Sequence, residues 1–470
     1  MAIEKIHGPE FLGDEAFGPR YKAFTLQNIL SIPQVQEYCS EDQIHEMAVV
    51  GHVLPFKTNN YVVDQLINWE NVPNDPIFIL NFPQRGMLRP RHFHRMEQAM
   101  ESTNDKKELL RVANEIRMEL NPQPAGQKTH NVPTVDGEPI AGMQHKYRET
   151  VLFFPSQGQT CHAYCTFCFR WPQFTGLNEL KFASREAEKL FRYVQQHPEV
   201  TDVLFTGGDP MVMREKMLRQ YLQPFIDGKL PHLKTIRIGS KSLSYWPGKY
   251  TTDRETQDIL QLFEEVNEAG IHLAFMAHFN HPQELRTGIL REAIEAIRGT
   301  RAQIRTQSPL LKHINDDPDD WARMWRTQVD LGMVPYYMFI ARDTGARQYF
   351  ELPLVKAWEI FHQAYKRVSG VCRTVRGPSM SALPGKVHVV GPAMMGEQKV
   401  LVLRFLQGRN PDWVTRPFFA KYDEAATWLD DLRPAFAEKF FYTDELDQML
   451  SNRDLFEEDY PEGTAFVPSD

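Results

Sequence analysis

Three cysteines within eight residues are the part of this sequence best suited to chemistry. They are Cys161, Cys165 and Cys168, spaced C-x3-C-x2-C in a 470-residue chain that has only five cysteines. Thiolates are soft ligands that suit iron–sulfur clusters or zinc. A [4Fe–4S] cluster held by three cysteines keeps one iron open, where a small molecule can coordinate. We therefore predict a [4Fe–4S] cluster that takes part in a reaction.

A zinc site is the alternative, with a fourth ligand such as His162 taken from nearby. Structural zinc sites usually combine one pair of cysteines with a second pair some distance away. The two remaining cysteines, Cys39 and Cys372, stand apart from each other and from the motif. The spacing favours the cluster, and a zinc-binding structural or regulatory protein stays open as a hypothesis of another class.

The composition is that of an ordinary globular protein, with 42% hydrophobic and 24% charged residues. A formal net charge of −8 does not indicate a protein that binds nucleic acid, which usually carries a basic surface. No apolar run approaches the roughly 20 residues that span a bilayer, and the first residues lack the apolar core of a secretory signal. The few cysteines indicate no disulfide framework. We expect a cytoplasmic protein without membrane or nucleic-acid partners.

From Thr150 the sequence alternates between short apolar runs and amphipathic helical stretches. The expected strands are residues 151–154, 203–205, 236–238, 271–276 and 334–340. Such alternation predicts βαβ units on a parallel sheet, an α/β protein whose units fit a full or partial (β/α) barrel. In such barrels chemistry lies on loops after the carboxyl ends of strands. We expect three parts, which are a mostly helical segment at 1–145, a barrel core at 146–395 and a C-terminal extension at 396–470 without assigned chemistry.

Local signals indicate several helix ends. Ser40 is expected to cap a helix that begins at residue 41. Thr252 and Glu255 are expected to form a capping box, and Pro318 fits the first position of a further helix. The polar stretch 121–130 predicts a linker.

A pair of glycines follows the second expected strand of the barrel, in Gly207-Gly208-Asp209-Pro210. Two glycines let the backbone approach a ligand closely and expose N–H groups to a cofactor that carries a carboxylate or amine. Taken alone, the pair is also the pattern of a tight turn.

The cysteine motif resembles the signature of the radical S-adenosylmethionine (SAM) enzymes. The resemblance implies that SAM binds the open iron, and that an electron from the cluster cleaves it to a 5′-deoxyadenosyl radical that abstracts hydrogen from the substrate. It also implies a barrel of the radical SAM type, an external electron donor, and SAM-binding roles for Gly207, Gly208 and Asp209.

A run of further landmarks is similar to the lysine 2,3-aminomutase family of radical SAM enzymes. It covers roughly residues 145–395 and comprises His278-Phe-Asn-His-Pro282, Gln307-Ser308-Pro-Leu-Leu311, Ile314-Asn-Asp316, Pro335-Tyr-Tyr337, Ser369-Gly370 and Pro384-Gly385-Lys386. The resemblance implies an isomerase in which pyridoxal phosphate (PLP) carries a migrating amino group. His278, Gln307 and Ser308 would then lie around SAM with Gly208.

Lys386 takes the position of the family's Schiff-base lysine, at the family's spacing from Ser369. A flexible amine that can be desolvated suits that covalent role, although most lysines are solvated surface residues. The family's arginines that clamp the PLP phosphate are replaced by Lys146 and Thr150, with Arg148 as a neighbouring substitute. A second hypothesis therefore stays open, a PLP-independent radical SAM enzyme on the same scaffold with other hydrogen-abstraction chemistry.

Arg170 matches the arginine that grips the substrate carboxylate in that family, a task that suits a guanidinium fork. The two aspartates that hold the distal ammonium of lysine are replaced by Arg342 and Ser379. An arginine there repels an ammonium and suits a carboxylate, phosphate or other anion. We expect the substrate to be an amino acid or derivative other than lysine, with an anionic side chain. Related enzymes associate, so the resemblance also implies a homo-oligomer.

Overall fold

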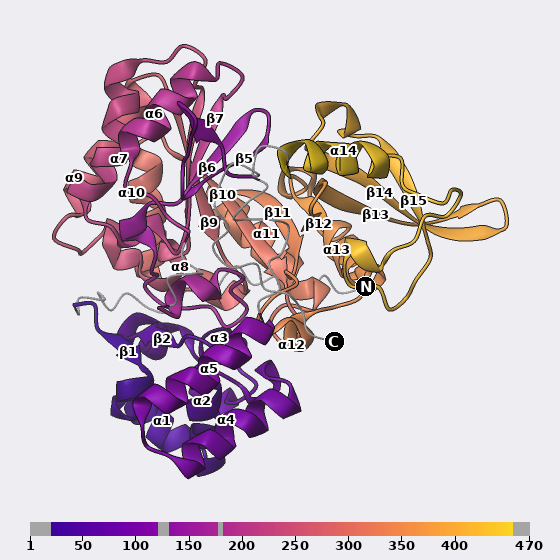
Figure 1. Cartoon of the computed structure of the whole chain (residues 1–470). Coiled ribbons are helices and arrows are strands. Elements are labelled where there is room, and N and C mark those ends of the chain that lie inside the picture. The colour runs from indigo at the N-terminus through magenta and orange to yellow at the C-terminus, as the bar shows by residue number, and fades with distance from the viewer. Residues whose placement is uncertain (1–19, 121–130, 177–181, 455–470) are drawn as a thin grey trace, which may run out of the picture.

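An eleven-stranded sheet forms the centre of the computed structural model, which describes residues 20–120, 131–176 and 182–454 (Figure 1). Its strands pair in the order β15-β14-β13-β12-β11-β10-β9-β8-β7-β6-β5. From β6 to β12 every neighbouring pair is parallel. These strands are β6 (Thr150–Phe153), β7 (Asp202–Phe205), β8 (Thr235–Ser240), β9 (His272–His278), β10 (Gln303–Leu310), β11 (Val334–Ile340) and β12 (Arg376–Ser381). All five expected strands are present.

Helices connect the parallel strands and cover the outer face of the sheet (Figure 1). They are α6 (Ala187–Gln196), α7 (Glu215–Gly228), α9 (Thr256–Glu268), α10 (Gly288–Gly299), α11 (Pro318–Asp330) and α13 (Leu354–Tyr365). Within the described residues the sheet does not close, since β5 (Met143–Tyr147) lies at one edge and β15 at the other. The predicted fold class, α/β with a partial (β/α) barrel, is confirmed. None of the described helices is both long and apolar enough to cross a membrane.

Helices of the N-terminal part pack into a second core against the barrel (Figure 1). They are α1 (Pro33–Tyr38), α2 (Glu41–Val53), α3 (Pro76–Asn81), α4 (Pro90–Ser102) and α5 (Lys106–Leu120), joined by the paired strands β1 (Ala23–Thr25) and β2 (Lys57–Asn59). In the cysteine loop, the N–H groups of Tyr164 and Thr166 donate to the carbonyls of Lys57 (2.7 Å) and Leu80 (2.9 Å). The N-terminal part therefore covers the edge of the barrel where the parallel strands end. The predicted linker at 121–130 lies outside the described residues.

Two of the three predicted helix starts agree with the structure. Ser40 forms a capping box at the start of α2, and Pro318 is the first residue of α11. The predicted capping box of Thr252 and Glu255 is wrong, because α9 starts without a side-chain cap. The carboxylate of Glu255 instead accepts a hydrogen bond from the N–H of Glu215 at the start of α7 (3.2 Å). A contact with another helix thus replaces the local one.

At its other edge the sheet continues into the C-terminal part of the chain. Strands β13 (Gly385–Met395), β14 (Gln398–Gly408) and β15 (Pro417–Lys421) pair antiparallel, and the first two project as a long hairpin (Figure 1). Glu445 of α14 (Thr443–Asp454) accepts from the indole N–H of the buried Trp413 (2.8 Å). The predicted boundary at 396 falls in the turn of this hairpin, and the division of the chain into domains stays a prediction.

Trp325 offers a test of the core between α11 and α13. Its ring is 2% exposed and packs against Phe361 (5.8 Å between ring centroids) and Tyr365 (6.3 Å). Because truncation leaves a cavity, Trp325→Ala is expected to lower the free energy of unfolding by about 3–5 kcal/mol. Arg326→Ala, on the exposed side of the same helix, is the matched control, with an expected change within about 0.5 kcal/mol. Urea unfolding measures both, and equal losses would contradict the packing.

Candidate functional site

The three thiols of the cysteine loop lie close together in a desolvated region after β6. Desolvation raises the pKa of Cys165 to about 11 and that of Cys168 to about 12. It raises the pKa of Cys161 well above the ordinary value, and repulsion from Cys168 and Cys165 adds to the effect. The protein alone thus favours neutral thiols, and the ligating thiolate form needs the positive charge of a metal.

The three thiols are donors that both an iron–sulfur cluster and zinc accept. A [4Fe–4S] cluster spreads its ligands over separate irons, whereas zinc gathers them around one centre. His162, the candidate fourth zinc ligand, packs edge-on against Tyr21 (5.8 Å between ring centroids). The donor set therefore suits the predicted cluster.

Side chains of the N-terminal part hold the backbone of the cysteine loop. Lys57 Nζ donates to the carbonyl of Cys161 (2.7 Å). Asn59 is fully buried, and its Nδ2 donates to the carbonyls of His162 (3.2 Å) and Tyr245 (2.9 Å). A buried carbonyl without a partner is costly, so these bonds select one loop conformation. No pattern in the sequence signals this role, because the partners lie about 100 residues away along the chain.

A buried ion pair lies beside Cys165. Lys241 Nζ is 2.5 Å from Glu284 Oε1 and 2.9 Å from Asn280 Oδ1, and Glu284 is fully buried. The hydroxyl of Ser244 and the N–H of Asn280 also donate to Glu284. A buried pair persists when its remaining donors and acceptors are satisfied in this way. After the larger effect of desolvation, the charge of Lys241 lowers the pKa of Cys165 and so favours its thiolate.

The glycine pair packs directly on the cysteine loop. A Cβ on Gly208 would lie 2.5 Å from the backbone nitrogen and oxygen of Thr160, so that only glycine fits. The N–H of Asp209 donates to the carbonyls of Gly158 (2.9 Å) and Thr160 (2.7 Å). Gly207 has a φ of +146°, a conformation that favours glycine. The segment therefore packs on the protein's own backbone, and its contact with a cofactor stays a prediction.

The carboxylate of Asp209 is occupied by donors of the protein. It accepts hydrogen bonds from the N–H groups of Met211 and Lys241 (both 2.9 Å) and from the hydroxyl of Ser240 (2.7 Å). Desolvation raises the pKa of this carboxyl to about 6. Asp209 thus anchors the glycine segment to the end of β8.

His278, Gln307 and Ser308 lie together at the ends of β9 and β10. Gln307 is the sheet partner of His278, and Ser308 Oγ accepts from Asn280 Nδ2 (3.0 Å). The ring of His278 packs edge-on against Phe167 of the cysteine loop (5.8 Å between centroids). Its Nε2 is buried without a hydrogen-bond partner among the described residues. Desolvation holds the pKa of His278 well below its ordinary value, so a neutral imidazole remains available to a ligand.

Two arginines bring unused donors into the site. Nε and Nη2 of both Arg170 and Arg342 are buried and lack hydrogen-bond partners in the described parts of the chain. Arg342 Nη1 donates to the carbonyl of Ser381 (2.8 Å), and its Nε is 3.7 Å from Asp343 Oδ1. Desolvation lowers the pKa of Arg170 to about 10, and repulsion from Arg342 also lowers it. Buried guanidinium nitrogens without hydrogen-bond acceptors are chemically suited to an anion.

Aromatic rings from two distant segments hold Arg342. Its guanidinium carbon lies 5.4 Å from the ring centre of Phe169 and 5.7 Å from that of Trp428. Such contacts stabilise a desolvated cation by about 0.5–2 kcal/mol each. Trp428 is buried and belongs to the C-terminal part. That part, for which the sequence indicates no chemistry, thus contributes a side chain to this site.

Lys386 lies on β13 with its amine over two rings of β11. Its Nζ is 4.1 Å from the ring centre of Tyr337 and 5.5 Å from that of Phe339. Desolvation lowers the pKa of Lys386 to about 7, and repulsion from Arg237 adds to the shift. A large fraction of the amine is therefore neutral, and nucleophilic, near pH 7.

Lys146 lies near both the amine of Lys386 and the guanidinium group of Arg342. Its amine donates to the carbonyl of Ala382. Desolvation is the main reason that the pKa of Lys146 lies well below its ordinary value, and repulsion from Arg409, Arg342 and Lys386 adds to it. These positive charges therefore share one interior region of the barrel, which favours an anionic ligand.

Three other predicted positions have partners or surroundings of a different kind. The hydroxyl of Ser379 is buried and donates to the carbonyl of Met338 (3.4 Å). The hydroxyl of Thr150 donates to Asp202 (2.9 Å). Arg148 is exposed in the turn between β5 and β6. The structure brings Ser381, rather than Ser379, to Arg342.

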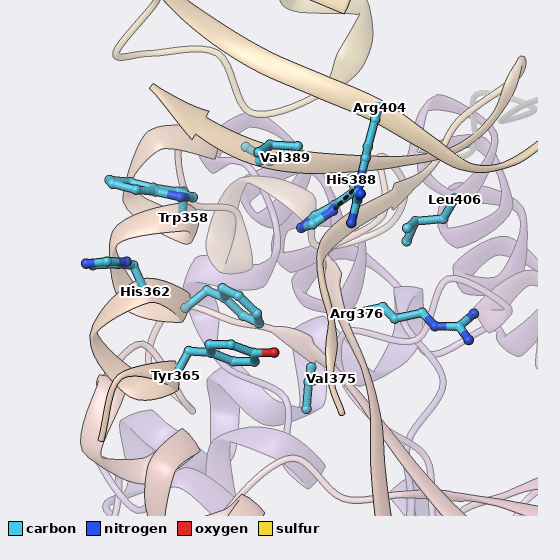
Figure 2. Close-up of a pocket in the computed structure, with 11 residues that line it drawn as sticks. Trp358, His362, Tyr365, Val375, Arg376, His388, Val389, Arg404 and Leu406 are labelled. Carbon is cyan, nitrogen blue, oxygen red and sulfur yellow. Dashed lines mark hydrogen bonds between the residues drawn. The ribbon is translucent and has the colours of Figure 1, made fainter. Parts of the chain in front are cut away.

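A cavity of about 300 Å³ lies elsewhere, between α13 and the β13–β14 hairpin (Figure 2). Trp358, His362 and Tyr365 form one wall, and His388 and Arg404 lie across from them (Figure 2). Arg404 Nε donates to His388 Nδ1 (3.2 Å). No predicted site residue lines this cavity.

Comparison with known proteins gives a consistent set of relatives. The chain is 29% identical over 414 residues to the "Putative L-lysine 2,3-aminomutase" of Aquifex aeolicus, which covers 88% of this chain and 96% of that protein. It is 27% identical over 235 residues to the L-lysine 2,3-aminomutase of Fusobacterium nucleatum, covering 50% of this chain and about half (52%) of that enzyme's length. Among solved structures, Streptococcus suis SuiB bound to precursor peptide SuiA gives a TM-score of 0.33 at 10% identity, covering 55% of this chain and 50% of that chain. No family model matches.

Gly208→Ala is expected to displace the cysteine loop, because the new Cβ would meet the backbone of Thr160 at 2.5 Å. Overpacking of this kind costs about 1–3 kcal/mol. After anaerobic reconstitution, the iron and sulfide bound per chain should fall well below those of the parent. Gly299→Ala is the matched control, since no atom lies within 4 Å of its added Cβ. A full complement of iron in Gly208→Ala would contradict the close packing.

Proposed function

We propose that this chain, a distant homologue of the L-lysine 2,3-aminomutases, is a radical SAM enzyme of the aminomutase type. It would move an amino group between C2 and C3 of an α-amino acid other than lysine. The observation that carries the proposal is the set of buried Nε and Nη2 atoms of Arg170 and Arg342, which lack hydrogen-bond partners among the described residues. Arg170 follows Cys168 by two residues. The charges of Arg342 and Lys386 both lower the pKa of Lys146, so these three side chains lie near one another. An anion-binding site, a nucleophilic amine and the cysteine loop are therefore neighbours.

The cysteine loop and its surroundings suit a [4Fe–4S] cluster and SAM. Cys161, Cys165 and Cys168 would hold the cluster. The residues that would border SAM are Gly207, Gly208, Asp209, His278, Gln307 and Ser308, among which the free Nε2 of His278 offers a direct hydrogen bond. When bound, these groups supply a carbon-centred radical that takes a hydrogen atom from the substrate.

The environment of Lys386 supports the use of PLP. Only a neutral amine attacks an aldehyde, and the lowered pKa of about 7 provides that form near neutral pH. The rings of Tyr337 and Phe339 shield the amine from water. When bound, PLP carries the migrating nitrogen. Lys146 is the cation that would meet its phosphate.

The substrate that best fits the two arginines has two anionic groups. Arg170 would bind the α-carboxylate, and Arg342 would bind an acidic group on the side chain. Each charge-assisted hydrogen bond contributes about 1.5–3 kcal/mol. A lysine substrate would place its ammonium against Arg342, which repels it.

The PLP-independent hypothesis stays as a second candidate, because the phosphate clamp of the family has changed. The hydroxyl of Thr150 donates a hydrogen bond to Asp202, and Arg148 is exposed. A phosphate would then meet a lysine, a point charge, in place of a bidentate guanidinium. This arrangement suits an enzyme that kept the radical chemistry and lost PLP.

Lys386 is expected to carry a pyridoxyl group after anaerobic protein is incubated with PLP and reduced with borohydride. Peptide mass mapping locates the modification. Because only the neutral amine reacts, the yield should rise with pH around a midpoint near 7, set by the pKa of about 7. The exposed Lys399 is the internal control for non-specific modification, and its yield at pH 7 should lie below that of Lys386. An unmodified Lys386, in protein that still cleaves SAM, would favour the PLP-independent candidate.

Arg342→Asp is expected to change the preferred substrate from acidic to basic amino acids. The variant loses charge-assisted hydrogen bonds and adds repulsion, together about 3 kcal/mol, or about 100-fold in kcat/KM for an acidic substrate. A panel of glutamate, aspartate, alanine and lysine measures the change. Arg404→Asp, on the exposed face of β14, is the control and should behave as the parent. An unaltered panel in Arg342→Asp would remove Arg342 from the substrate site.

A further inference from the structure

One side chain of the barrel reaches a cluster cysteine directly. The hydroxyl of Tyr245 lies 3.3 Å from Cys165 Sγ. Tyr245 is 1% exposed and ends the short helix α8 (Ser242–Tyr245), which follows β8. A sulfur that ligates iron carries no proton, so the phenol must be the donor of this hydrogen bond.

Three contacts hold the phenol in this position. Asn59 Nδ2 donates to the carbonyl of Tyr245 (2.9 Å), and the side chain of Asn81 interacts with its hydroxyl. Lys241 Nζ lies 4.4 Å from the ring centre, while its ion pair with Glu284 fixes the amine. Tyr245 is buried and Cys165 is partly buried, so the hydrogen bond lies in surroundings of low polarity, where it is stronger than in water.

We propose that Tyr245 is a positioning residue that sets the reduction potential of the [4Fe–4S] cluster through its hydrogen bond to Cys165 Sγ. When an external donor gives one electron to the cluster, negative charge on the ligand sulfurs increases. A hydrogen bond to such a sulfur strengthens and stabilises the reduced state, which raises the potential. The inference rests on the cluster of the proposed function and is independent of PLP and of the amino migration.

The test is a redox titration of reconstituted protein, without SAM or substrate, followed by electron paramagnetic resonance. Dithionite and mediators supply the electron. Tyr245→Phe keeps the ring and removes the donor. Its reduced-to-oxidised ratio at a fixed potential is expected to fall about tenfold, which for a one-electron couple is a midpoint about 59 mV more negative. Iron and sulfide per chain confirm that the cluster is intact.

Tyr250→Phe is the matched control, since Tyr250 is equally buried and its hydroxyl contacts Ser242 Oγ (2.6 Å). Its midpoint should equal that of the parent. Should Tyr245→Phe fail to hold the cluster, 3-fluorotyrosine at position 245 decides, because its phenol is a stronger donor and should make the midpoint less negative. An unchanged midpoint in Tyr245→Phe or with 3-fluorotyrosine, or an equal shift in Tyr250→Phe, would overturn the inference. None of these outcomes depends on whether Lys386 binds PLP.

Discussion

Hydrogen bonds to the backbone of the cysteine loop are the constraint on which the rest of the site depends. A loop whose side chains are committed to ligating metal cannot use those side chains to fix its own shape. Its carbonyls and N–H groups must therefore find partners elsewhere. Lys57 and Asn59 supply them from the N-terminal part, and Asp209 supplies them from the loop after β7. Strand β2 of the mostly helical N-terminal part thus becomes part of the candidate cluster site.

The second physical feature is an excess of buried positive charge. Arg342 lowers the pKa of Arg170, and Arg342 and Lys386 lower the pKa of Lys146, while Asp343 is the acid beside Arg342. Desolvated like charges are unfavourable unless a counter-charge joins them. An anionic ligand would supply that charge, which is in keeping with the proposed acidic substrate. The aromatic rings around Arg342 lower the free-energy cost of burying its charge without neutralising that charge.

Much of the fold was predictable because its signals are local. The apolar runs of β6, β7, β8, β9 and β11 and the caps at Ser40 and Pro318 depend on neighbouring residues alone. The spacing of the three cysteines likewise predicts a cluster from eight neighbouring residues alone. Prediction failed at Glu255, whose carboxylate bonds to a helix 40 residues away. The roles of Asn59 and Trp428 could not be predicted for the same reason, since a single polar or aromatic residue does not reveal a distant partner.

The positions of these partners along the chain also separate two stages of assembly on the ribosome. Domains fold from the N-terminus as they emerge. Lys57, Asn59, Asp209 and Tyr245 all precede Arg342, whose ring partner Trp428 is made much later. The residues that support the cysteine loop are therefore synthesised before the aromatic residue that completes the surroundings of Arg342.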